Sequence, residues 1–356
     1  MNMPLVSMLK TANFKLLAVA GLTFAFAASG QTQTQNQTET KTYTKPIEGP
    51  TLATPLSKGT DGQPAPDVGA GSAYGAFQRG YYLTALQLAL PRADAGDPAA
   101  QTLIAEIYWN GLGVARDRKK AVEWYRFAAD AGNPQAQFFL GNLLLSGDEV
   151  EKDKAAGEEL MKKAAKKGHA RANFNLAQIL TARRPTWAGF KRALPLYEKA
   201  AEAGIADAQY AMANIHAEAQ GVPYNDDKIA RKWLARSARN GLEAAQVELG
   251  VWMANGRGGP KDEDGAGRWF AQAAAKGNVL AQNRLARMNA FGIGKTADPI
   301  TASAWHVLAS RAGYSDPEMD RLFQSLSTID KKRALEAADQ LSQRIKTAKA
   351  SIRTRG

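Results

Sequence analysis

The sequence predicts an all-α fold, an α/α superhelical solenoid of helix-turn-helix repeats with a capping helix near the C-terminus. Two observations predict it. Glycines recur in one register, in steps of 36 or 37 residues, at Gly96, Gly132, Gly168, Gly204, Gly241, Gly277 and Gly313. An alanine-rich segment precedes most of them, and a segment with a fixed apolar place follows all but the last. A fixed period of this length is typical of solenoids, in which each unit stacks on its neighbours.

The segment that follows each glycine, here called helix A, is expected to start four residues after the glycine. Its places are counted from the alanine that opens it, which is Ala100 in the first repeat. The fifth place is always Leu, Ile or Met, and the sixth is always Ala or Gly. A large side chain followed by a small one lets neighbouring helices approach closely.

The segment that precedes each glycine, here called helix B, carries Leu or Trp eight residues before it. The glycine suits the left-handed residue that ends a helix. Between helix A and helix B lie G-x-G loops, at Gly111/Gly113, Gly256/Gly258 and Gly292/Gly294. A dinucleotide-binding fingerprint requires a strand before its glycines, so these loops are interpreted as tight helix–helix turns. The loops within residues 146–160 and 181–197 depart from this pattern, and we expect them to differ in shape.

Residues 100–132, AQTLIAEIYWNGLGVARDRKKAVEWYRFAADAG, resemble the Sel1-like repeat pattern A-Q-x-x-L-G-x-x-Y-x-x-G-x-G-V followed by K-A-x-x-W-x-x-x-A-A-x-x-G, with Ala105 in the Gly place. The resemblance covers about residues 75–313. It begins with a half unit, residues 75–96, that is expected to supply only helix B. The resemblance implies a tetratricopeptide-like superhelix that works as an adaptor. It also implies an exported bacterial type, whose members often regulate or assemble envelope systems, and no catalytic residues.

Four segments are expected along the chain. Residues 1–30 read as a secretory signal peptide, with a basic start and a short apolar run; an uncleaved N-terminal membrane anchor is the alternative. Residues 31–74 are polar and rich in Thr, Gln, Pro and Gly, which predicts a disordered linker. Residues 75–313 form the solenoid, one half unit plus six repeats. Residues 314–356 form a capping helix, with Thr328 or Asp330 as its N-cap, and a basic tail.

The charge favours anionic partners. The chain carries +12, and removal of Lys10 and Lys15 leaves +10. The last seventeen residues hold five Lys or Arg and no acidic residue. For a periplasmic or secreted protein such partners are acidic glycans or lipid headgroups, and no nucleic acid is expected. The other interpretation of the charge is that it only keeps the surface soluble.

Nothing in the pattern indicates an enzyme, a cofactor or a metal site. The chain has no cysteine, and its three histidines, His169, His216 and His306, are far apart in the sequence. The carboxylates Glu158/Glu159 and Asp262/Glu263/Asp264 have no partner in the sequence that would raise a pKa for acid catalysis. They are interpreted as solvated surface charge, and the chain is expected not to be an enzyme.

Two rows of helix A are candidates for binding a partner. The third place is aromatic in Phe138, Phe174 and Tyr210, a row interpreted chiefly as packing. The seventh place carries amides in three consecutive repeats, Asn142, Gln178 and Asn214, which could hydrogen-bond an extended peptide. The function expected is therefore an exported protein–protein interaction scaffold that assembles or regulates a cell-envelope system. The alternative is a polyanion-binding protein that uses its positive charge.

Overall fold

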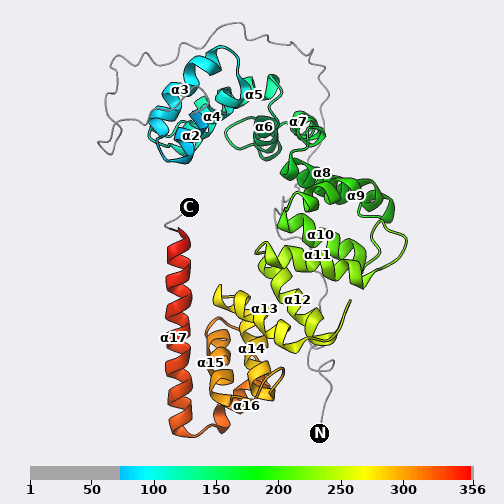
Figure 1. Ribbon diagram of the computed structural model, residues 1–356, viewed down its shortest axis with the longest axis vertical. Helices are drawn as coiled ribbons and strands as arrows, with labels where there is room; N and C mark the ends of the chain where they lie inside the picture. Colours follow the sequence, from blue (N-terminus) through cyan, green and yellow to red (C-terminus); the bar gives the residue numbers. More distant parts are fainter. Residues whose placement is uncertain (1–72, 354–356) are drawn as a thin grey trace, which may run out of the picture. The chain divides into compact units, whose positions relative to one another are not determined.

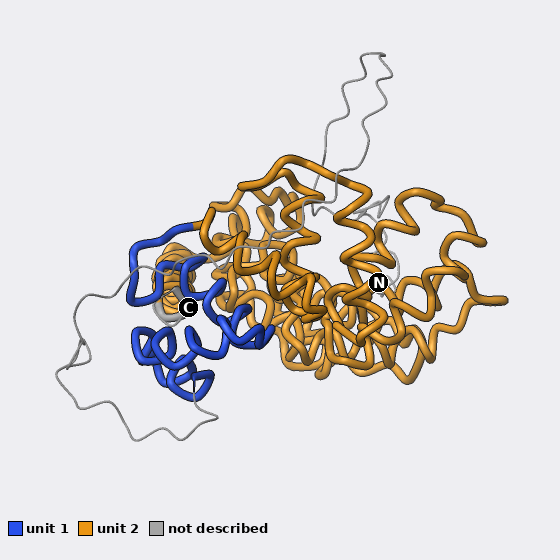
Figure 2. The backbone as a smooth tube through the Cα atoms, turned by 90° about the horizontal axis from the view of Figure 1, so that it is seen from above, with its two compact units in different colours: residues 1–117 blue, residues 118–356 orange. Residues whose placement is uncertain are grey.

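The computed structural model of the chain describes residues 73–353. These residues form α-helices joined by turns, with no β-strand among them. The chain divides into two compact units, residues 1–117 and residues 118–356 (Figure 2). The expected signal peptide and all but the last two residues of the expected linker lie outside the described residues.

The first unit contains three described helices. They are α2 (Ala73–Gln78), α3 (Tyr82–Asp94) and α4 (Pro98–Asn110). The expectation that the half unit supplies only helix B is wrong, because the short helix α2 precedes helix B, which is α3. Ala73 and Ala76 of α2 are buried, and α2 packs against α3.

The second unit is an α-solenoid in which α5 to α15 each pack against the next helix of the chain (Figure 1). Its helices are α5 (Arg118–Asp130), α6 (Pro134–Ser146), α7 (Lys154–Lys166), α8 (Ala170–Arg183), α9 (Trp187–Glu202), α10 (Ala206–Ala217), α11 (Asp227–Arg239), α12 (Glu243–Asn255), α13 (Glu263–Ala275), α14 (Val279–Phe291), α15 (Pro299–Arg311), α16 (Pro317–Ser325) and α17 (Thr328–Arg353). Even-numbered helices from α4 to α14 are helix A, and odd-numbered helices from α3 to α15 are helix B.

The glycine after each helix B is in the left-handed conformation, as predicted. The seven φ angles lie between +85° at Gly168 and +92° at Gly277. Helix A then begins two residues after the glycine, not the four expected. The residue between them is the N-cap, and the side chains of Asp97, Asn133, His169 and Asn278 accept backbone N–H groups there. These bonds satisfy donors that a helix start leaves free.

A buried amide at the second place of helix A holds the turn together. The Gln137 amide nitrogen donates to the carbonyl oxygen of Ala129, eight residues earlier in helix B, at 3.1 Å. The same bond recurs in every repeat, from Gln101, Asn173, Gln209, Gln246 and Gln282. It gives a second donor to a carbonyl in the last turn of helix B that also accepts the N–H of the turn glycine, as Ala129 accepts that of Gly132 at 2.9 Å. The sequence pattern contained this residue, but its role was not predicted.

The small sixth place lies where helix A crosses helix B of the same repeat. A Cβ added to Gly141 would lie 3.1 Å from the carbonyl oxygen of Gly157, and one added to Gly250 would lie 2.6 Å from the Phe270 ring. The close approach predicted for this place is therefore present. It lets the two helices bury small and apolar side chains between them, as Ala177 of α8 and Ala193 and Tyr197 of α9 do.

The G-x-G loops are tight helix–helix turns, as predicted, with φ between +65° and +71° at all six of their glycines. A non-glycine residue takes one of these left-handed places in two other loops: Glu149 at φ +60° between α6 and α7, and Ala219 at φ +54° between α10 and α11. In residues 181–197, by contrast, Thr186 caps α9 directly, through a bond from the Gly189 N–H to its hydroxyl.

The C-terminal helices cover the last repeat. Ala338 of α17 is buried against Ala304 and Leu308 of α15. The N-cap expected at Thr328 or Asp330 is instead Ser327, whose hydroxyl accepts the Asp330 N–H at 3.1 Å while bonding the Asp330 carboxylate. Helix α16 was not predicted.

Helix α17 also supplies a contact that other repeats obtain from the next helix B. Lys276 at the end of α13 donates to the carbonyl oxygen of Gly241, 35 residues earlier, at 3.0 Å. Lys167 bonds Gly132 in the same way. The place that Lys276 occupies at the end of α13 is taken by Ala312 at the end of α15, which has no amine to reach Gly277. Instead, the Nζ of Lys349 from α17 lies 2.7 Å from the position that a Cβ of Gly277 would take. This contact supports the capping role expected of residues 314–356, which stays a prediction.

Among the described residues, no helix combines the length and the apolar character that a membrane crossing requires.

The left-handed glycines are predicted to differ in tolerance. Gly204 has φ +90° with no atom within 4 Å of an added Cβ, whereas at Gly221 (φ +76°) that Cβ would lie 2.4 Å from the Lys191 nitrogen. Gly204→Ala is expected to cost only the conformational term, about 1–2 kcal/mol. Gly221→Ala adds backbone overlap and is expected to cost about 1–3 kcal/mol more. Denaturant unfolding measures both, and equal losses would contradict the close approach.

His169 is predicted to make stability pH-dependent. Burial and the neighbouring Arg171 lower its pKa from 6.5, and its Nδ1 accepts the Ala172 N–H as the N-cap. The unfolded chain therefore binds the proton more readily, so stability present above about pH 6.5 is lost as pH falls through the folded pKa. His169→Asn keeps a capping side chain and removes this part of the loss. The check is unfolding at pH 7.5 and pH 5; identical pH slopes for both proteins would contradict it.

Candidate partner-binding surface

The seventh place of helix A lies at the edge of the core in every repeat. All six residues there are half-buried: Glu106, Asn142, Gln178, Asn214, Val251 and Arg287. Places one helical turn away on the same face, such as Ala182 and Glu218, are exposed. The seventh place is therefore the inner border of an accessible band along helix A, here called the helix A stripe.

Asn142 is already engaged by the following repeat. The Asn175 amide nitrogen, at the fourth place of α8, donates to the Asn142 side-chain oxygen at 3.1 Å. A peptide could still reach the Asn142 amide nitrogen, but its oxygen helps to hold α6 and α8 in register. We therefore assign Asn142 a mainly structural role.

Asn214 belongs to a polar cluster between α10 and α12. Its side chain hydrogen-bonds the Tyr210 hydroxyl, and that hydroxyl donates to the Glu248 carboxylate at 2.7 Å. Burial, and then the nearby Glu248 charge, raise the pKa of Tyr210. Burial also raises the pKa of Glu248, against the lowering effects of its bond from Tyr210 and of the Arg257 charge. Burial therefore favours the neutral form of both the Tyr210 hydroxyl and the Glu248 carboxyl group.

Gln178 is the one of the three predicted residues whose side-chain amide has no hydrogen-bond partner within residues 73–353. It lies between Asn142 and Asn214 in the order of the repeats and is half-buried on a rigid helix. An amide offers both a donor and an acceptor. Gln178 is therefore the residue of the stripe best suited to a backbone hydrogen bond from a partner.

The aromatic third places pack, as expected, and do not form an open ladder. Phe138 is buried and stacks on His169, with ring centroids 4.5 Å apart. Phe174 meets the Tyr197 ring edge-on at 6.1 Å. Tyr210 alone of the three carries a hydroxyl, which donates a hydrogen bond to Glu248. These aromatic side chains therefore pack in the core one helical turn before the residues of the stripe.

In the last repeat the chain itself covers the stripe. Arg287 contacts Asp316 at 2.8 Å and Glu318 at 2.6 Å, and the Asn283 amide donates to Asp316 at 2.7 Å. Asp316 also caps α16. The Asp316 pKa is lowered, since the bonds from Asn283 and Arg287 outweigh the effect of burial. The sequence reasoning missed this site, although Asp-Pro-Glu at 316–318 is a helix-start signal that could have placed α16 here.

The paired carboxylates are surface groups with structural partners. Glu158 pairs with Arg183, and Glu159 with Lys162. Asp262 caps α13, and Glu263 pairs with Lys261. Over residues 73–353, no three side chains of the His, Cys, Asp and Glu types are grouped as a metal ion would require.

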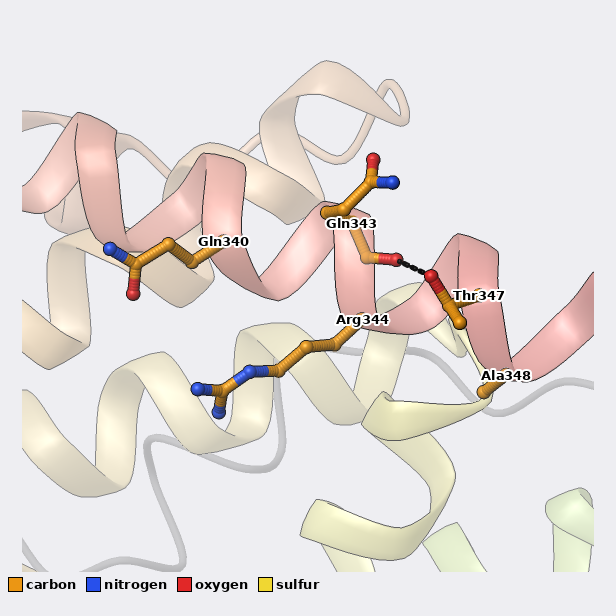
Figure 3. A pocket seen from close by; sticks show the side chains of 5 residues that line it. All are labelled: Gln340, Gln343, Arg344, Thr347 and Ala348. Carbon is orange, nitrogen blue, oxygen red and sulfur yellow. Dashed lines mark hydrogen bonds between the residues drawn. The ribbon is translucent and has the colours of Figure 1, made fainter.

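A shallow, open hollow lies beside α17 (Figure 3). Its lining residues all belong to that helix: Gln340, Gln343, Arg344, Thr347 and Ala348. The Thr347 hydroxyl donates to the Gln343 carbonyl oxygen at 3.0 Å, so it is satisfied within the helix. Arg344 is the only charged group of this lining. None of the three predicted amides lies here.

Glu248 is predicted to reduce stability at neutral pH. Its pKa is raised from 4.5, chiefly by burial, so stability present below about pH 4.5 is lost as pH rises through the folded pKa. Glu248→Gln keeps an oxygen for the Tyr210 hydroxyl and removes the charge. The variant is expected to be more stable than the natural chain at pH 7, with the difference shrinking towards pH 4. Unfolding at both pH values tests this, with the exposed Glu159→Gln as control. A variant less stable at pH 7 would contradict it.

Comparison with known proteins agrees with the repeat architecture. The family model described as Sel1 repeat matches residues 98–133, 134–169, 189–205, 206–242, 243–278 and 279–314. The short match at 189–205 falls on α9, and the unmatched residues before it hold α8 and the altered loop. A search of curated proteins returned no match.

Two solved structures share the fold. One is a protective antigen present in uropathogenic Escherichia coli strains that displays an SLR fold; it is 24% identical, with a TM-score of 0.62, over 77% of this chain and 62% of that chain. This chain thus spans less than two thirds of that antigen's length. The other is a Sel1 repeat protein from Oxalobacter formigenes, 28% identical, with a TM-score of 0.57, over 69% of this chain and 98% of that chain. With six matched segments that together exceed half of its length, the chain belongs to the Sel1 repeat family.

Proposed function

We propose that this chain is an exported scaffold or adaptor that binds another protein along the helix A stripe and assembles or regulates a cell-envelope system. Sel1 repeat solenoids generally serve protein–protein interaction. The observation that locates the proposed binding surface is the side chain of Gln178, a half-buried amide with no hydrogen-bond partner within residues 73–353.

The stripe suits an extended segment of a partner. Its amides stand one per repeat on helices whose starts and turns are fixed by caps and by the second-place bonds. A preformed site loses little conformational entropy on binding. Main-chain groups of an extended peptide can bond such amides, and its side chains then confer specificity.

Export supports the envelope part of the proposal. Residues 1–30 have the pattern of a secretory signal peptide. A partner met after export would be an envelope protein or one of its peptide segments. An uncleaved N-terminal anchor would place the same stripe beside the membrane and leave this proposal unchanged.

A second candidate is polyanion binding by the end of α17. Arg344, Lys346 and Lys349 are exposed, and no acidic residue follows Asp339. Acidic glycan or lipid headgroups would be held by charge, so binding would fall steeply with salt. A bond to a half-buried amide is much less salt-sensitive, which separates the two candidates.

The test is capture of envelope proteins by the exported chain at about 0.1 M and at about 0.5 M NaCl. Contacts between exposed charges are weakly screened at the lower concentration and strongly screened at the higher one. A discrete protein retained at both salts is expected. Gln178→Ala should weaken its binding about fivefold, the loss of one hydrogen bond of about 1 kcal/mol. Gln178→Arg should weaken it further by bulk and charge. The control is Gln272→Ala, on the exposed face of α13.

Retention that neither Gln178 variant changes would contradict the stripe as the binding surface. Capture of glycan or lipid alone, released by salt and lost on deletion of residues 344–356, would favour the second candidate.

A further inference from the structure

Two consecutive repeats depart from the loop pattern at the same edge of the second unit. The α8–α9 connection carries Arg183-Arg184-Pro185-Thr186-Trp187, and the α10–α11 loop carries Tyr224. Trp187 is 48% exposed and Tyr224 is 70% exposed. Large aromatic side chains are rarely left in water without a reason when they lie together.

The two loops are held side by side. The Trp187 indole nitrogen donates to the Val222 carbonyl oxygen at 3.0 Å, two residues before Tyr224. Gly221 lies so close to the backbone of Phe190 and Lys191 that no Cβ would fit. Because the indole N–H is satisfied internally, the exposed part of Trp187 is apolar. The bond and the close approach therefore fix Trp187 beside the loop that carries Tyr224.

Three exposed cations lie in the α8–α9 connection and in the first turns of α9. The Nζ of Lys191 lies 4.9 Å from the centre of the Trp187 ring. Arg184, Lys191 and Arg192 are exposed, and within the described residues no carboxylate lies within salt-bridge distance of them. Arg183 is neutralised by Glu158.

Of the nearby acids, Asp227 pairs with Arg257 at 2.8 Å. Asp226 caps α11 and Glu218 accepts a bond from Gln220, so these two carboxylates keep their charge. The three cations Arg184, Lys191 and Arg192 outnumber them, so the edge formed by Arg184, Trp187, Lys191, Arg192 and Tyr224 carries a net positive charge. We call these five residues the aromatic–basic edge.

We propose that the aromatic–basic edge docks on the surface of a bilayer that contains anionic lipids. Trp and Tyr are the side chains enriched at the headgroup level of membranes, and clustered Lys and Arg are attracted to anionic leaflets. Trp187 is the first residue of α9 and Tyr224 lies in the α10–α11 loop, and both side chains are exposed for contact with a surface. This site lies outside the helix A stripe and outside the tail, so it can be tested independently of the function proposed above.

The experiment uses the full chain and a site-specific dye. The chain has no cysteine, so Asn225→Cys, beside Tyr224, can be labelled alone with an environment-sensitive fluorophore. The control label is Glu202→Cys, at the far end of α9 and about 22 Å along that helix from Trp187. Vesicles of phosphatidylcholine with about one third phosphatidylglycerol are compared with phosphatidylcholine alone, to detect attraction to anionic lipid.

A blue shift and a gain of emission are expected for the Asn225→Cys label on anionic vesicles only, with no change for the Glu202→Cys label. Arg184→Gln with Lys191→Gln and Arg192→Gln should weaken the response about 100-fold, as expected for three basic groups at an anionic surface. The matched control is Lys162→Gln with Lys163→Gln and Lys166→Gln, three exposed cations of α7. That control should weaken it less than threefold. Tyr224→Ser should weaken it without altering the fold.

The proposal is overturned if the Asn225→Cys label does not respond, if both labels respond alike, or if the two triple variants lose binding equally. A response to soluble heparin equal to that on vesicles would also overturn it, in favour of a glycan. A protein partner that needs Gln178 but not this edge would leave the function proposed above intact.

Discussion

The turn between helix B and the next helix A is the constraint on which the rest of the solenoid depends. A glycine at φ near +90° reverses the chain, and a side-chain amide at the second place of helix A bonds a carbonyl of the preceding helix B. Two helices therefore leave each turn at a fixed angle. Because the turn repeats, the sixth place always meets helix B, and the seventh always stays at the edge of the core. The helix A stripe is thus a consequence of the turn.

Period and side-chain size were sufficient to predict the architecture, since both are local and recur in one register. Helix starts were less well predicted, because the N-cap is a single polar residue, such as Asn133, that accepts backbone N–H groups of the first helical turn. Ile205 and Leu242 stand at the same place with no capping side chain. Helix α16 was missed because its stability comes from Asp316, whose partners Asn283 and Arg287 lie about thirty residues earlier.

The sequence predicted that the candidate residues form a row on one face, but not which of their amides are available to bind a partner. Spacing alone places Asn142, Gln178 and Asn214 on one face. Whether each amide is available depends in part on what the next repeat places beside it. Asn175 reaches Asn142, and Glu248 holds the Tyr210 hydroxyl that Asn214 bonds. The Asn142–Asn175 and Tyr210–Glu248 bonds join residues 33 and 38 positions apart and follow from packing, so no local pattern indicates them. The aromatic–basic edge has the same origin, since it exists only because two irregular loops adjoin.

Along the helix A stripe, some amides are held by bonds within the solenoid and others are accessible. Gln178 is both accessible and carried by a rigid helix. The measurement that tests this most directly is photo-crosslinking in the living cell, with a photoreactive residue at position 178 or, as control, at position 272. A covalent adduct with one discrete protein from position 178 and none from position 272 is the predicted result. No adduct at 178, or the same adducts at both positions, would contradict the claim that the helix A stripe binds the partner.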